Sequence, residues 1–142
     1  MAYREKIAWM SLVGMAATLG LYFVWVRVAG DETAPLPNLG MMGAYAVAAV
    51  AWAAFYLLGG LALRLKDPAE ARARPDERDI AIDRRSTQVA YFVLMGLMLY
   101  VGGFKPFQSQ GWEIVNAAIA SVVIAEVVRC IVAVLSYRRS AA

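Results

Sequence analysis

The sequence predicts an all-α protein, a bundle of four membrane-spanning helices, from three observations. Hydrophobic residues make up 61% of the 142 residues, well above the roughly 45–50% of a typical soluble domain. The apolar residues form four long runs, and a bilayer core about 30 Å thick needs about 20 helical residues for each crossing. Most charges gather in one internal segment, 64–88, which separates the runs into two pairs. We therefore expect residues 1–142 to form a single integral membrane domain.

The four predicted spans cover about residues 7–29, 39–63, 86–104 and 112–136. The first run is longer than the apolar core of about 7–15 residues in a signal peptide, so we expect it to be retained. Short segments rich in Gly and Pro, 30–38 and 102–111, predict tight turns within each pair of spans.

The polar segment 64–88 holds seven of the fourteen Lys and Arg residues and six of the eleven Asp and Glu residues. Within it, Pro75 followed by three acids is typical of a helix start, because proline suits the first helical position and acids face the positive end of the helix dipole. The helical pattern then continues into the third span. We therefore expect one long helix over about 75–104 whose first turns extend into the cytoplasm.

The distribution of cations predicts the orientation. Twelve of the fourteen Lys and Arg residues lie on the side of both termini in this layout, and only Arg27 and Lys105 lie on the other side. Cytoplasmic loops carry the excess of positive charge in membrane proteins. We therefore expect a multi-pass protein of the bacterial inner membrane with both termini in the cytoplasm.

Small residues recur at every fourth position on the second and fourth spans, which lets a neighbouring helix approach closely. We expect these two spans to form a close pair, and the protein to form a homo-oligomer or to bind another membrane protein. The two strips are Gly40, Ala44 and Ala48, and Ala117, Ser121 and Ala125.

The residues that the chain lacks exclude several functions. It has no histidine and a single cysteine, Cys130, so haem ligation through imidazole, most zinc sites and dithiol redox chemistry are excluded. No nucleophile and base can be paired, so we expect no enzyme activity and no cofactor. Positive and negative charges are interleaved, so we also expect no nucleic-acid partner.

Three polar residues within the fourth span are candidates for a functional site. Glu126 is near its middle, where an ionised carboxylate costs about 2.5–3.5 kcal/mol on the insertion scale. Arg129, three residues later, could pair with it for purely structural reasons; alternatively, Glu126 is a proton- or cation-coupled site in a small transporter or channel. Asn116 is typical of a hydrogen bond between helices.

Small multidrug antiporters are the rival class for a chain with four spans. Their chemistry depends on a glutamate embedded in the first span. Residues 7–29 contain no acid, and Glu126 is not equivalent by position, so the sequence does not favour this class.

The start of the long third helix carries an acidic stripe, which consists of Asp76, Asp79 and Asp83. These carboxylates lie on one helix face, and none has a cation three or four residues downstream. The stripe is therefore a solvated or salt-bridged face, a hard-cation site or a docking surface for a partner protein. We expect it to bind cations of the two termini, namely Arg4, Lys6, Arg138 or Arg139.

The motif Asp76-Glu77-Arg78-Asp79, with Ile80 after it, resembles the run that opens the third span in an uncharacterised family of small prokaryotic four-span membrane proteins. The resemblance covers the four-span layout, and its specific part is about a dozen residues. It implies no catalytic activity. It marks the following residues for testing: Asp76, Glu77, Arg78, Asp79 and Asp83.

The sequence thus predicts a small non-enzymatic integral membrane protein that contacts a partner or senses the state of the membrane. The alternative is a small proton-coupled transporter or channel that uses Glu126.

Overall fold

Each apolar run forms one long helix in a computed structural model of the protein, which describes residues 3–139 apart from the side chain of Ala71. The described part is helical and contains no strand, and four of its helices are long and apolar enough to cross a membrane. The elements are α1 (Tyr3–Ala29), α2 (Leu39–Lys66), α3 (Pro68–Arg72), α4 (Glu77–Gly103), the short 3-10 helix η1 (Lys105–Phe107) and α5 (Trp112–Arg139). The predicted all-α fold with four long apolar helices is confirmed.

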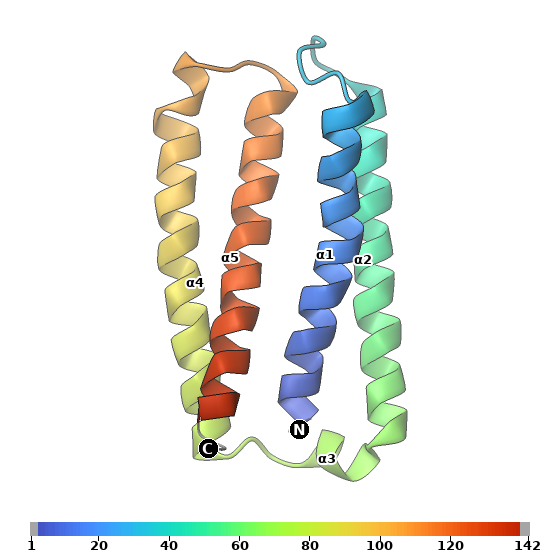
Figure 1. Ribbon diagram of the computed structural model, residues 1–142, viewed down its shortest axis with the longest axis vertical. Helices are drawn as coiled ribbons and strands as arrows, with labels where there is room; N and C mark the ends of the chain where they lie inside the picture. The colour runs from blue at the N-terminus through green and yellow to red at the C-terminus, as the bar shows by residue number, and fades with distance from the viewer. Residues whose placement is uncertain (1–2, 140–142) are drawn as a thin grey trace.

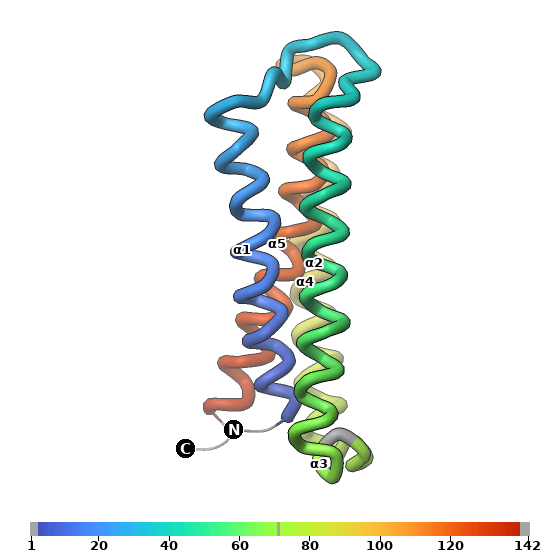
Figure 2. The backbone as a smooth tube through the Cα atoms, turned by 90° about the vertical axis from the view of Figure 1, so that its right-hand side faces the viewer, coloured from blue at the N-terminus to red at the C-terminus, as the bar shows by residue number. Residues whose placement is uncertain are grey.

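The four long helices lie side by side along one axis (Figure 1). The start of α1, the end of α5 and the short helix α3 lie at one end of the bundle, and the loops 30–38 and 104–111 lie at the other. Across the bundle the order is α4, α5, α1, α2. In the view turned by 90°, α2 and α4 lie on the same side of the bundle (Figure 2). Helices α1 and α5 therefore lie in the middle of the bundle, with α2 and α4 at its two edges.

The predicted close pair of the second and fourth spans is wrong. The extensive helix contacts in the described part are those of α4 with α5, α1 with α2 and α1 with α5. Ala48 of the α2 strip packs in a cluster with Met15 and Leu19 of α1. The close approach of α2 to α1 depends instead on Gly14 of α1, because a Cβ at this position would overlap the ring of Phe55 on α2. A strip of small residues permits close packing without specifying the partner helix.

The predicted long third helix is confirmed, because α4 runs without a break from Glu77 to Gly103. Asp76 is its N-cap and accepts a hydrogen bond from the backbone N–H of Asp79 (2.6 Å), while the Asp79 carboxylate accepts one from the backbone N–H of Asp76 (3.4 Å). This capping box satisfies two backbone donors at the helix start. The helix therefore begins two residues later than Pro75, at the acids themselves.

The hydrophobic core is small and centres on α1. Helix α2 contributes two buried residues, Met41 and Ala48, to the described core. The buried residues of the main cluster are Met15, Leu19, Tyr22, Val26, Met41, Ala48 and Trp112. The outer faces of the helices consequently expose large apolar side chains, as expected for surfaces that contact lipid.

Candidate functional site

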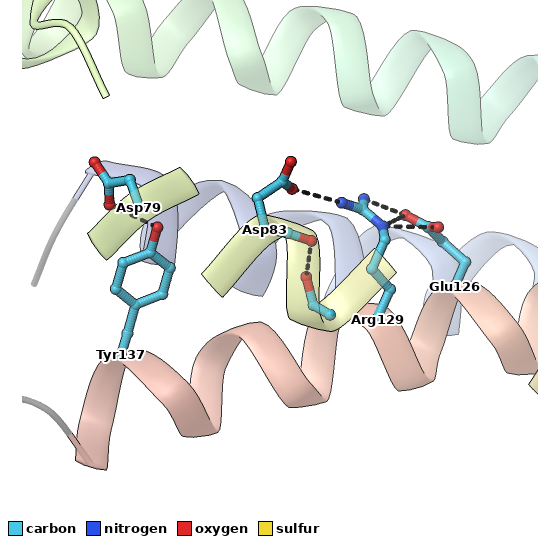
Figure 3. Close-up of polar contacts among 6 residues, drawn as sticks. Asp79, Asp83, Glu126, Arg129 and Tyr137 are labelled. Atoms are coloured by element: carbon cyan, nitrogen blue, oxygen red, sulfur yellow. Dashed lines mark hydrogen bonds and ion pairs between the residues drawn. The ribbon is translucent and has the colours of Figure 1, made fainter. Parts of the chain in front are cut away.

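Arg129 of α5 bridges two carboxylates (Figure 3). Its Nε donates to both carboxylate oxygens of Glu126, at 2.9 Å each, and its Nη2 also donates to Oε1. Its Nη1 lies 3.9 Å from Oδ1 of Asp83 on α4. The pairing of Glu126 with Arg129 that the sequence suggested is present, and Asp83 joins it from the neighbouring helix. We call Asp83, Glu126 and Arg129 the charged triad.

The charged triad lies at a large cavity. Glu126 and Arg129 line a cavity of about 760 Å³ that is bounded by all four long helices. Ligand-binding cavities in proteins commonly measure about 300–1,000 Å³. Its walls are otherwise largely apolar, and the residues that line it are Met15, Leu19, Tyr45, Ala49, Trp52, Ala53, Thr87, Ala90, Tyr91, Leu94, Met98, Ala118, Ile119, Val122, Val123, Ala125, Glu126 and Arg129. A carboxylate near the middle of α5 therefore faces a space large enough for a small molecule.

The order of charges along α5 determines what such a molecule would meet first. Apart from Glu126 and Arg129, the α5 residues that line the cavity lie between Ala118 and Ala125, and all of them precede Glu126 in the helix. Arg129 follows Glu126, and its guanidinium lies between the carboxylates of Glu126 and Asp83 (Figure 3). Along the helix, Glu126 is therefore the charged residue nearer to the apolar part of the lining.

A smaller cavity of about 240 Å³ lies on the other side of Arg129. Asp83 and Arg129 line it together with Arg4 and Tyr137, which lie at the end of the bundle that holds the chain ends. Arg129 is common to both cavities. A series of polar side chains therefore leads from this end of the bundle to the large cavity.

A second polar cluster forms around Asp79. The hydroxyl of Tyr137 donates to Oδ1 of Asp79 (2.8 Å), and Arg4 Nε lies 3.4 Å from its Oδ2. Arg78 donates from Nη2 to the backbone carbonyl of Tyr137 (3.2 Å). The start of α4 is therefore attached to both α1 and α5, while Glu77 lies exposed in its first turn.

Of the terminal cations predicted to bind the acidic stripe, Arg4 does so. Arg4 pairs with Asp79 as expected. Lys6 instead contacts Asp67 (2.8 Å) and Glu70 (3.7 Å), and Arg138 lies 3.8 Å from Glu5. Lys6 extends toward the α2–α3 junction, which the sequence alone did not place beside α1.

Asn116 joins α1, α5 and the loop 30–38 at the opposite end of the bundle. It accepts a hydrogen bond from the hydroxyl of Tyr22 (2.5 Å) and donates from Nδ2 to Glu32 (2.8 Å). The expected hydrogen bond between helices is present. Tyr22 and Glu32 were not singled out from the sequence, because a tyrosine near the end of an apolar run and an acid in a turn are common in membrane proteins.

Three sets of comparisons give no relatives: the chain matches no protein-family model, no curated protein and no solved structure. Within residues 3–139, no three Asp, Glu or Cys side chains come together as a metal site. The resemblance of the Asp76–Asp79 motif to a family of small membrane proteins stays a prediction.

Proposed function

We propose that the protein spans a bacterial inner membrane four times, with both termini and residues 64–88 in the cytoplasm. The excess of cations at one end of the bundle supports this orientation. Cysteines placed at Ala73 and Gln108, in a Cys130→Ala background, should react with an impermeant maleimide from opposite sides of the membrane. Labelling of both from the same side would contradict the topology.

We further propose that the chain binds a small, largely apolar molecule inside the bilayer. A transporter that uses Glu126 would need this binding step first. The observation that supports this function is the cavity of about 760 Å³ with Glu126 in its wall. Intramembrane ionisable residues generally mark ligand or ion pathways. The polar series through Arg129 and Asp83 to Arg4 connects this site with the proposed cytoplasmic end. No catalytic step is part of the proposal.

The geometry favours this function over binding of a partner protein through the acidic stripe. Asp76 and Asp79 form the capping box of α4, Asp79 also binds Tyr137 and Arg4, and Asp83 faces Arg129. Each carboxylate of the stripe thus already has an intramolecular role. A homo-oligomer stays a prediction.

The experiment measures binding of three probes to the purified protein by equilibrium dialysis, with detergent alone as the blank. The probes are tetraphenylphosphonium, tetraphenylborate and neutral triphenylmethane. At least one should bind with a stoichiometry of one per chain, and Ala118→Phe or Ala49→Phe should abolish this binding, because both alanines line the cavity. Ala54→Phe, at an exposed α2 position outside the lining, is the matched control and should bind normally.

The proposed function is wrong if none of the three probes binds above the blank. It is also wrong if the two filled variants bind as well as the control, because the probe would then occupy another surface.

A further inference from the structure

We infer that the molecule that occupies the large cavity is a lipophilic organic cation, whose positive centre lies against Glu126 and whose apolar body fills the rest of the cavity. This inference rests on the proposed function and specifies its ligand class. It is carried by three observations: the direction of the ion pair, the engagement of Arg129 and the aromatic side chains in the walls.

Both members of the ion pair line the cavity, and Glu126 is the one nearer to the rest of the α5 lining. Along α5 the apolar lining residues precede Glu126, and Arg129 follows it. Coulomb interactions weaken with distance and strengthen where water is excluded. A ligand charge among Ala118, Val122 and Glu126 is therefore closer to a carboxylate than to a guanidinium, which favours a positive charge.

Arg129 is poorly placed to bind an anion in the cavity. It is the single cation among the lining residues of the described chain. Its Nε and Nη2 donate to Glu126, and its Nη1 faces Asp83 at 3.9 Å. An anionic ligand would compete with Glu126 for the guanidinium, whereas a cation can approach Glu126 while the pair stays intact.

Aromatic rings supply further negative electrostatic surface. Tyr45 and Trp52 of α2 and Tyr91 of α4 line the cavity. Trp52 stacks on Tyr56, with ring centroids 5.9 Å apart, and Tyr45 packs edge-on against Tyr22. The faces of such rings attract cations, most effectively where water is excluded. Aromatic side chains of both α2 and α4 therefore line the large cavity, which suits an organic cation with an apolar body.

The deciding measurement is the charge preference of the wild-type protein. Tetraphenylphosphonium and tetraphenylborate have nearly the same size and shape and opposite charges. We expect the cation to bind about tenfold or more tightly than the anion, because its charge lies beside Glu126. Neutral triphenylmethane should bind with intermediate affinity. This comparison needs no variant, so it stays decisive if a substitution at Glu126 prevents folding.

Three variants test the origin of the preference. Glu126→Gln should remove most of it, and Glu126→Asp should retain most of it, because the charge is kept. Glu113→Gln, which removes an acid from the first turn of the same helix and outside the lining, is the matched control and should behave as wild type. Thermal unfolding of each variant in detergent reports whether the fold is retained.

The outcomes separate the two proposals. Equal affinity for the three probes, or tighter binding of the anion, overturns the cation inference and leaves the proposed ligand-binding function standing. A cation preference that persists unchanged in a folded Glu126→Gln protein also overturns the inference. Absence of binding by every probe overturns both.

Discussion

Helices α2 and α5 have the same length, 28 residues, and both are apolar enough to cross a membrane, yet they occupy different positions in the bundle. Helix α5 packs against both α1 and α4, whereas α2 has extensive contacts with α1 alone among the long helices. The buried residues of α2 are Met41 and Ala48; those of α5 are Trp112, Asn116, Ser121, Ala125, Cys130, Val134 and Tyr137.

Polar side chains account for the difference better than apolar content does. The stretch from Leu39 to Leu63 of α2 contains no charged residue, whereas α5 carries Asn116, Glu126 and Arg129 along its length. Lipid solvates an apolar helix face as well as a protein interior does, but polar groups within the bilayer need protein partners or a hydrated cavity. The central helix is therefore the one whose polar side chains must be satisfied by its neighbours.

The largest effect expected from this comparison is that of Ser121→Phe in α5. Ser121 is 3% exposed, and its hydroxyl donates to the carbonyl of Ala117 (2.8 Å). A phenyl ring cannot fit there without moving a neighbouring helix, which typically costs about 1–3 kcal/mol. Thermal unfolding in detergent should show a marked loss of stability. Ala54→Phe, on the exposed side of α2, should change the free energy of unfolding by no more than about 0.5 kcal/mol. Equal losses in both would mean that α2 is as enclosed as α5.

A smaller effect is expected for Ala48→Leu, at the one buried position in the middle of α2. Ala48 is 9% exposed and packs with Met15 and Leu19 of α1. The larger side chain should shift α2 relative to α1 and lower the free energy of unfolding by about 1 kcal/mol. This value is at the low end of overpacking effects, because α2 has extensive contacts with no other long helix in the described part of the chain and can move outward. Crosslinking between cysteines at Met10 and Gly59, which are in contact across α1 and α2, should decrease. Ala46→Leu, at an exposed position two residues away, should leave this crosslinking unchanged.

The smallest effect concerns the C-terminal end of α2, where Asp67 accepts a hydrogen bond from Lys6 of α1 (2.8 Å). This hydrogen bond lowers the pKa of the Asp67 carboxyl below its usual range. The resulting stabilisation is complete above the ordinary aspartate pKa of about 3.9 and is lost as the pH falls through the lowered pKa. Asp67→Asn should therefore reduce the melting temperature slightly at pH 7 and have no effect at pH values below the lowered pKa. Glu70→Gln, which loses a longer contact of 3.7 Å, should have less effect at pH 7. A difference between wild type and Asp67→Asn that does not depend on pH would show that the ion pair does not hold this end of α2.

The sequence alone determined the number and the extent of the long helices. Four apolar runs of bilayer length, turns marked by Gly and Pro and the acids after Pro75 predicted the helices of the structure to within a few residues at most ends. Local signals sufficed, because hydropathy, caps and helix breakers act within a few residues along the chain. The pairing of Glu126 with Arg129 was also predictable, since three residues of separation place both on one face of a helix.

Only the tertiary structure decided which helices pack together and what lies between them. The small-residue strips suggested that the second and fourth spans pair, but the Gly14–Phe55 contact places α2 against α1. Asp83 meets Arg129, and Asn116 meets Tyr22 and Glu32, through contacts between residues 46 to 94 positions apart. In lipid every apolar face is about equally acceptable, so hydrophobic patterning specifies no partner. Steric fit and the few polar groups therefore select the arrangement. The cavity beside Glu126 depends on that arrangement, because residues of all four long helices line it.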